Sequence, residues 1–160
     1  GLGDVYKRQA LNPETRGFWT CFVVVGGGGI TISLILAILK FSKREDHKAI
    51  SKLSILPGLC GINEPIVFGL PLVLNPIFAV PFIFNSAIAA GIALFATNIG
   101  FIKAGIFDVP PGLPLFINAF IGFGWKGIIV QAVIIIVTFF TWTPFVLMSN
   151  SEKKVESTTE

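Results

Sequence analysis

The chain has 160 residues, of which 53% are hydrophobic and 13% charged, with a formal net charge of +3. Soluble domains carry about 25% charged residues, so this composition excludes an ordinary water-soluble globular protein. The net charge does not indicate nucleic-acid binding, because the cationic residues cluster in loops beside apolar segments. The composition predicts an all-α polytopic membrane protein.

The N-terminal residues differ in character from the rest of the chain. Residues 1–9 are polar and lack the apolar core of a signal peptide. We expect residues 1–15 to be a non-native or disordered leader, joined to a fragment of a longer protein. Residues 16–148 are predicted to form the membrane domain, and residues 149–160 a disordered cytoplasmic tail.

The first predicted transmembrane span is Gly17–Leu39, which is long enough to cross a bilayer if it is helical. Four consecutive glycines, Gly26 to Gly29, lie in its middle. In a helix each would cost about 1 kcal/mol relative to alanine. Small residues permit close approach of a neighbouring helix or of a bound ligand, and both interpretations fit this run.

A basic segment, Lys40–Lys52, follows the first span and is predicted to be a polar loop. Short loops rich in Lys and Arg stay in the cytoplasm, so we assign this loop to that side. His47, the only histidine, lies among its charged residues and is interpreted as a solvated side chain. On this topology the proline-rich connection at Lys103–Pro114 is external.

Three prolines and three glycines interrupt Leu53–Leu74, so the segment cannot form one regular spanning helix. We predict a re-entrant hairpin with its tip near Asn63-Glu64-Pro65, with a kinked spanning helix as the alternative. The apolar segment from Asn75 to Ile102 is predicted to be one spanning helix. A last span is predicted from Asn118 to Thr143-Pro144, which gives about three transmembrane helices plus the hairpin.

Glu64 is the only charged residue in the 50 positions between Lys52 and Lys103. A carboxylate within a bilayer costs roughly 3 kcal/mol on insertion scales unless it faces a cavity or a partner. Interrupted backbone at membrane depth is likewise found where it is buried in protein or lines a water-filled site. Since both features coincide at Glu64, the sequence predicts a substrate or ion site there.

The run from Leu59 to Pro76, LCGINEPIVFGLPLVLNP, carries a specific family resemblance. It resembles the C-terminal part of the lactose/cellobiose-type enzyme IIC, the membrane permease of the bacterial sugar phosphotransferase system. Supporting similarities are the Gly-Gly-Gly-Gly-Ile-Thr run before the basic segment and Gly124-Trp125-Lys126 before the last span. The resemblance extends over about Arg16 to Met148 and corresponds to roughly the last third of such a transporter.

The resemblance implies part of a substrate-binding half built from re-entrant hairpins in a multi-pass protein of the bacterial inner membrane. It implies translocation of a β-linked disaccharide such as cellobiose, lactose or chitobiose, which a separate IIB component phosphorylates. Glu64 is then the candidate catalytic residue, and Asn63 and Glu64 are the candidate substrate-binding residues. IIA and IIB are the implied protein partners, with a homodimer as the full-length form.

We expect no metal or cofactor. Cys21 and Cys60 both lie in apolar sequence without metal-ligand spacing, and we interpret them as buried, inert thiols. Phe68 or Trp125 could stack on a sugar ring, although packing within the membrane is the simpler interpretation of both.

Two departures from the family pattern leave details open. The family places a histidine opposite the glutamate, and no residue of this chain matches it. Gly112 stands where some relatives carry an aromatic residue, so the particular sugar stays undetermined. Two other functions also fit the pattern: an ion-coupled secondary transporter with a midplane carboxylate, and a structural membrane subunit in which Glu64 only caps a hairpin.

Overall fold

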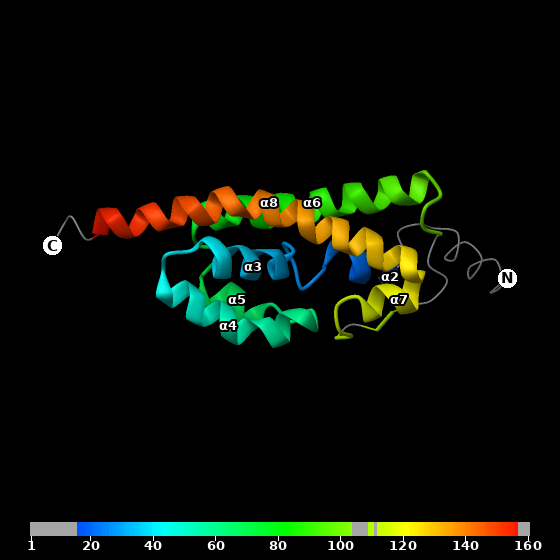
Figure 1. Cartoon of the computed structure of the whole chain (residues 1–160), viewed down its shortest axis with the longest axis horizontal. Coiled ribbons are helices and arrows are strands. Elements are labelled where there is room, and N and C mark those ends of the chain that lie inside the picture. The colour runs from blue at the N-terminus through cyan, green and yellow to red at the C-terminus, as the bar shows by residue number, and fades with distance from the viewer. Residues whose placement is uncertain (1–15, 104–108, 111, 157–160) are drawn as a thin grey trace.

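The computed structural model describes residues 16–103, 109–110 and 112–156, and every regular element within them is a helix. The predicted all-α fold class is therefore confirmed (Figure 1). The elements in chain order are α2 (Arg16–Phe18), a π-helical turn η1 (Trp19–Val23), α3 (Thr31–Phe41), α4 (Glu45–Leu59), α5 (Glu64–Gly69), α6 (Pro76–Asn98), α7 (Ile117–Phe123) and α8 (Trp125–Glu156).

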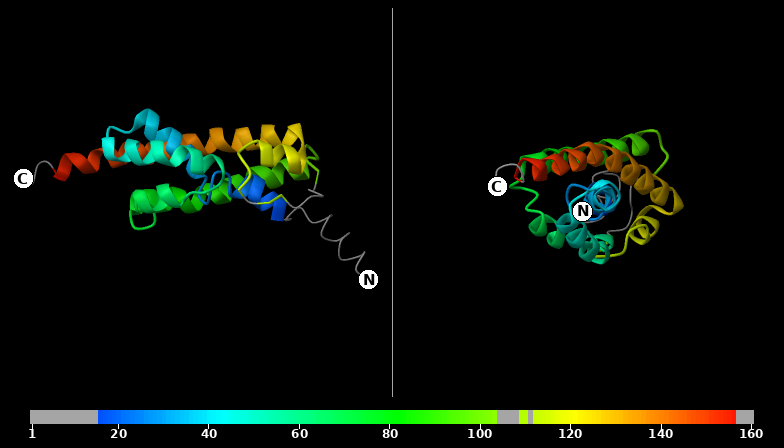
Figure 2. Two further views of the ribbon diagram at one scale, coloured as in Figure 1. Left: turned by 90° about the horizontal axis from the view of Figure 1, so that it is seen from below. Right: turned by 60° about the vertical axis from the view of Figure 1, so that its left-hand side comes forward.

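The two longest helices, α6 and α8, run antiparallel and side by side along the molecule (Figures 1 and 2). Pro76–Asn98 and Trp125–Ser151 are long and apolar enough to cross a membrane, as judged by length and composition. Helix α6 begins where we predicted, because the Asn75 side chain accepts a hydrogen bond from Ile77 N at 2.9 Å. Pro76 occupies the first turn, where its missing N–H is not needed.

The segment Gly17–Leu39, which we predicted to be long enough to cross a bilayer if it were helical, does not form one helix. Residues 24–30 are irregular, with positive φ at Gly26, Gly27, Gly29 and Ile30. A right-handed helix has negative φ at every residue, so the backbone must break here. The predicted span is divided into the short element η1 and the 11-residue helix α3.

Helix α3 lies in the interior, with the other helices arranged around it (Figure 2, right). Seven of its eleven residues are buried, two of them polar. Ser33 Oγ lies 3.0 Å from Ile135 O and 2.8 Å from Thr138 Oγ1, and both partners belong to α8. Hydrogen bonds of this kind join apolar helices where water is absent.

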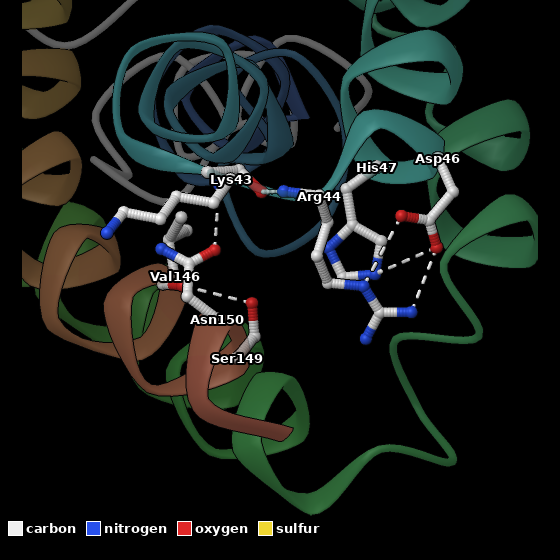
Figure 3. A network of polar contacts seen from close by, with 8 residues as sticks. Lys43, Arg44, Asp46, His47, Val146, Ser149 and Asn150 are labelled. Carbon is white, nitrogen blue, oxygen red and sulfur yellow. Dashed lines mark hydrogen bonds and ion pairs between the residues drawn. The ribbon is translucent and has the colours of Figure 1, made fainter. Parts of the chain in front are cut away.

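The segment Lys40–Lys52, which we predicted to be a loop, belongs mostly to α4, and only residues 42–44 connect it with α3. The missed signal is the pair Glu45 and Asp46 in the first turn of α4, where acidic residues interact favourably with the helix dipole. Lys43 N donates a hydrogen bond to Asn150 Oδ1 at 2.9 Å, which attaches this connection to α8 (Figure 3).

His47 is only 6% exposed, so the interpretation as a solvated side chain is wrong. Because α4 is helical here, His47 faces inward against Phe78 of α6, with their ring centroids 5.9 Å apart. Its Nε2 lies 3.9 Å from the Asp46 carboxylate, which also binds Arg44 at 2.9 Å (Figure 3). The hydrogen bond from Arg44 holds the pKa of Asp46 below its usual value.

The last predicted span is also divided. Helix α7 ends at Phe123, Gly124 takes a φ of +73°, and α8 begins at Trp125. Helix α8 contains Pro144 and continues to Glu156, beyond the predicted end at Thr143-Pro144. Part of the predicted disordered tail is thus helical, and its last residues, 157–160, lie outside the described part of the chain.

Candidate functional site

Two interrupted stretches of backbone come into contact with each other. The first is residues 24–30, here called the glycine segment, and the second is residues 60–63, here called the α4–α5 turn. A Cβ atom on Gly27 would overlap Asn63 Cβ, so the two stretches approach as closely as glycine permits. Asn63 Nδ2 donates a hydrogen bond to Gly28 O at 3.3 Å. The glycine run therefore allows the backbone to approach the α4–α5 turn of the same chain.

The two long helices hold the glycine segment in place. Gly29 N donates to Ser86 Oγ of α6 at 3.1 Å, and Trp142 Nε1 of α8 donates to Gly29 O at 3.2 Å. Trp142 is fully buried, and a Cβ atom on Gly29 would lie 2.5 Å from the ring of Phe82. Side chains of α6 and α8 thus satisfy backbone groups that an irregular segment leaves without helical partners.

A pocket of about 190 Å³ lies where the glycine segment, the α4–α5 turn and the segment before α7 come together. Leu115 N donates a hydrogen bond to Leu59 O at 2.7 Å and so attaches that last segment to the end of α4. The pocket combines aromatic and apolar walls with few polar groups, as small-molecule sites do, and its volume is below the roughly 300–1,000 Å³ of typical sites. Its walls include Trp19, Gly26, Cys60, Gly61, Leu115 and Asn118.

The structure places Asn63 and Glu64 next to the pocket, two and three residues after Gly61 in its wall. Asn63 is partly buried and in contact with the glycine segment, whereas Glu64 begins α5 and is exposed. Among the described residues Glu64 has no ion pair and no side-chain hydrogen bond. Neither residue lines the pocket directly, and their assignment as site residues stays a prediction.

The other residues that we singled out from the sequence are distributed differently. Phe68 and Trp125 are 78% and 61% exposed, and neither lines the pocket, which favours packing against lipid or protein over stacking on a sugar. Cys21 is buried, as predicted, but Cys60 is partly exposed in the pocket wall. The interpretation of Cys60 as a buried thiol is therefore wrong.

Sequence reasoning missed Asn118 and Gln131, which are both buried and polar. Gln131 Nε2 donates to Cys21 O at 2.8 Å and to Asn118 Oδ1 at 3.1 Å. Its Oε1 accepts from Phe116 N at 2.8 Å. An amide in the middle of the last apolar segment was the available signal, since polar groups at membrane depth need partners.

The sequence model of the family described as "Phosphotransferase system, EIIC" matches residues 6–86, which is half of the chain. A solved structure, that of the transporter ChbC, the IIC component from the N,N'-diacetylchitobiose-specific phosphotransferase system, superposes with a TM-score of 0.85 at 30% identity. The match covers 91% of this chain and 34% of that one.

Two curated relatives agree with this result. The cellobiose-specific EIIC component of Lactococcus lactis subsp. lactis (strain IL1403) is 40% identical, over 96% of this chain and 33% of its own. The oligo-beta-mannoside-specific EIIC component of Bacillus subtilis (strain 168) is 34% identical, over 85% of this chain and 33% of its own. The chain spans about a third of the length of each of these three proteins. It belongs to the phosphotransferase system EIIC family.

Proposed function

We propose that the full-length parent of this chain is the membrane permease of a phosphoenolpyruvate-dependent sugar phosphotransferase system. It binds a β-linked disaccharide and carries it across the membrane, where a separate IIB component phosphorylates it. The IIA component in turn supplies IIB with the phosphoryl group. The observation that carries the proposal is the pocket formed where two interrupted backbone segments meet, beside Asn63 and Glu64. Interrupted backbone at membrane depth is found where it lines a site.

Cellobiose is the first sugar to test, and lactose and chitobiose follow. The relatives described above are named for cellobiose, oligo-beta-mannosides and N,N'-diacetylchitobiose, all of them β-linked. Another relative, from Staphylococcus haemolyticus (strain JCSC1435), is a lactose-specific EIICB component, 33% identical over 90% of this chain and 24% of its own.

Glu64 is proposed to act on the sugar hydroxyl that receives the phosphoryl group. Its carboxylate has no competing partner among the described residues, so it is available to accept a hydrogen bond from that hydroxyl. As the hydroxyl oxygen bonds to phosphorus and the bond between phosphorus and the IIB donor breaks, Glu64 takes the hydroxyl proton. Asn63 Oδ1 has no partner in the described part of the chain and can accept from a second hydroxyl.

In the membrane, α6 and α8 are proposed to span the bilayer. Helices α4 and α5, with the turn between them, form a re-entrant hairpin, and η1 with α3 forms a third, broken membrane segment. Large apolar side chains on these helices, and Leu74 in the turn before α6, are exposed and would face lipid or the remainder of the protein. Those on the helices are Leu53, Leu56, Phe68, Ile83 and Phe95. The full-length form is proposed to be a homodimer in the bacterial inner membrane.

The direct test replaces Glu64 by Gln in the full-length parent and compares it with Glu45→Gln, an exposed carboxylate in the first turn of α4. Loss of a general base lowers rates by about 10²–10⁴-fold, so phosphoenolpyruvate-dependent uptake of cellobiose should fall by at least about a hundredfold in the Glu64 variant. The Glu45 variant should transport like the parent.

Unchanged cellobiose binding and uptake in Glu64→Gln would contradict the site assignment. The alternative function, an ion-coupled secondary transporter, shares the broken helices and the isolated carboxylate. Uptake that follows an ion gradient in vesicles without phosphoenolpyruvate, and delivers unmodified sugar, would favour that alternative over the phosphotransferase.

A further inference from the structure

Asn118 is a buried polar side chain of the pocket wall whose amide oxygen, but not its nitrogen, has hydrogen-bond partners among the described residues. It is 7% exposed, and its Oδ1 accepts hydrogen bonds from Ala119 N at 2.6 Å and from Gln131 Nε2 at 3.1 Å. Its Nδ2 has no hydrogen-bond partner among the described residues. An amide carries two N–H donors on that nitrogen. The nitrogen is not among the fully buried side-chain atoms that have no partner, so its N–H groups remain accessible.

Backbone groups fix which way both amides are oriented. Phe116 N–H can only donate and Cys21 C=O can only accept, so the Gln131 amide must place Oε1 toward Phe116 and Nε2 toward Cys21. Nε2 then faces Asn118, which must present its oxygen to Gln131 and to Ala119 N–H. The nitrogen of Asn118 is consequently the atom left for the pocket.

The surroundings of the pair resist rearrangement. Phe116, the residue before α7, has a φ of +67°, a conformation that costs a non-glycine residue about 1–3 kcal/mol and persists only where neighbours hold it. The hydrogen bond to Gln131 supplies that restraint. The Cys21 thiol also donates to Asn118 O, at 3.4 Å, which ties the start of α7 to η1.

We infer that Asn118 is a sugar-binding residue that donates a hydrogen bond from Nδ2 to one hydroxyl oxygen in the pocket, and that Gln131 is its positioning residue. The inference rests on the proposed function, since it takes the occupant of the pocket to be the transported sugar. A preorganised donor selects for an acceptor at one position of the sugar, because a ligand that covers the donor but lacks that acceptor leaves the N–H groups unpaired. The pair therefore sets specificity at one hydroxyl.

The test uses the purified full-length parent, cellobiose, and the set of cellobiose derivatives in which one hydroxyl at a time is replaced by hydrogen. Asn118→Asp keeps the shape and the Oδ1 contacts but removes the donor. One lost hydrogen bond is worth up to about 1.5 kcal/mol, so cellobiose affinity should fall about tenfold. The matched control is Asn98→Asp, the same change at an exposed position at the end of α6, and it should bind like the parent.

The derivatives separate a sugar contact from a general loss of structure. For the parent, one deoxy derivative should bind about tenfold more weakly than cellobiose. For Asn118→Asp, the same derivative and cellobiose should bind equally well, as a double-mutant cycle requires of two groups in contact. Gln131→Glu removes the donor that orients Asn118 and should remove the dependence on the same hydroxyl. It also keeps the inference testable if Asn118→Asp does not fold.

Cellobiose binding unchanged in Asn118→Asp, or a loss that is additive with every deoxy derivative, would overturn the inference. If binding depends on Glu64 but not on Asn118, the inference fails and the proposed function stands. If the unmodified parent binds none of cellobiose, lactose and chitobiose, the proposed function fails.

Discussion

Gly27 is subject to two independent constraints at the residue scale. Its φ of +100° is unfavourable for any residue with a Cβ, and that Cβ would overlap Asn63. We predict that Gly27→Ala in the full-length parent displaces the α4–α5 turn. Backbone strain and overpacking each cost about 1–3 kcal/mol, so cellobiose affinity should fall at least tenfold in a binding titration.

Gly28→Ala is the matched control for this change. A Cβ at Gly28 would lie 3.6 Å from Phe82 Cζ and 3.7 Å from Asn63 Nδ2, which are ordinary contacts, and its φ is not positive. This variant should bind cellobiose like the parent. Equal binding by both variants would show that the close approach of Gly27 to Asn63 has no part in the site.

The sequence alone was informative about individual residues where a single property stood out. Glu64 is conspicuous because its charge is isolated in apolar sequence, and the structure places it after a backbone break next to a pocket. Gln131 offered a signal, an amide within apolar sequence, but its pairing with Asn118 could not be predicted, because it depends on contacts between η1, α7 and α8. The burial of His47 was likewise hidden, since its charged neighbours suggest a solvated loop.

At the scale of elements, α8 stabilises the glycine segment through one side chain. Trp142 Nε1 donates to Gly29 O, and both groups are buried. Trp142→Phe keeps most of the ring but leaves this carbonyl unpaired, which costs about 1–3 kcal/mol. We predict a lower thermal unfolding temperature of the full-length parent in detergent and weaker cellobiose binding.

Trp125→Phe provides the comparison, because Trp125 is 61% exposed and belongs to the same helix. The unfolding temperature of the Trp125→Phe variant should stay close to that of the parent. If both tryptophan variants lose stability equally, the effect is a general one of tryptophan in α8 and the specific contact with Gly29 is not its cause.

The elements differ in how far local sequence determines them. Helix α6 is predictable because Asn75 and Pro76 mark its start and an apolar run follows. The break inside the first span was missed because a glycine run fits a tightly packed helix as well as an irregular segment, and only tertiary contacts decide between them. The break at Gly124 was missed for the same reason, since one glycine inside an apolar run rarely ends a helix.

At the scale of the whole molecule, the connection between α3 and α4 lies at the same end as the last turns of α8 (Figures 1 and 3). The end of α6 lies at the opposite end (Figure 1). We predict that Lys43→Cys in the full-length parent reacts with a membrane-impermeant thiol reagent only from the cytoplasmic side. Asn98→Cys should react only from outside.

Reaction of both positions from the same side would contradict this topology. The lysine and arginine residues near α4 predict which end of the molecule faces the cytoplasm. The structure adds that the α3–α4 connection and the last turns of α8 lie at that same end. Overall shape was beyond sequence reasoning, because the central position of α3 depends on helices that follow it in the chain (Figure 2).

The most direct measurement uses Cys21 and Cys60 in the full-length parent. Cys60 is partly exposed in the pocket wall, whereas Cys21 is fully buried and serves as an internal control. The rate of alkylation of each thiol is followed by peptide mass spectrometry with and without saturating cellobiose. We predict that cellobiose slows alkylation of Cys60 severalfold and leaves Cys21 unreactive in both conditions. Alkylation of Cys60 at the same rate with a sugar that the protein demonstrably binds would contradict the placement of the sugar in this pocket.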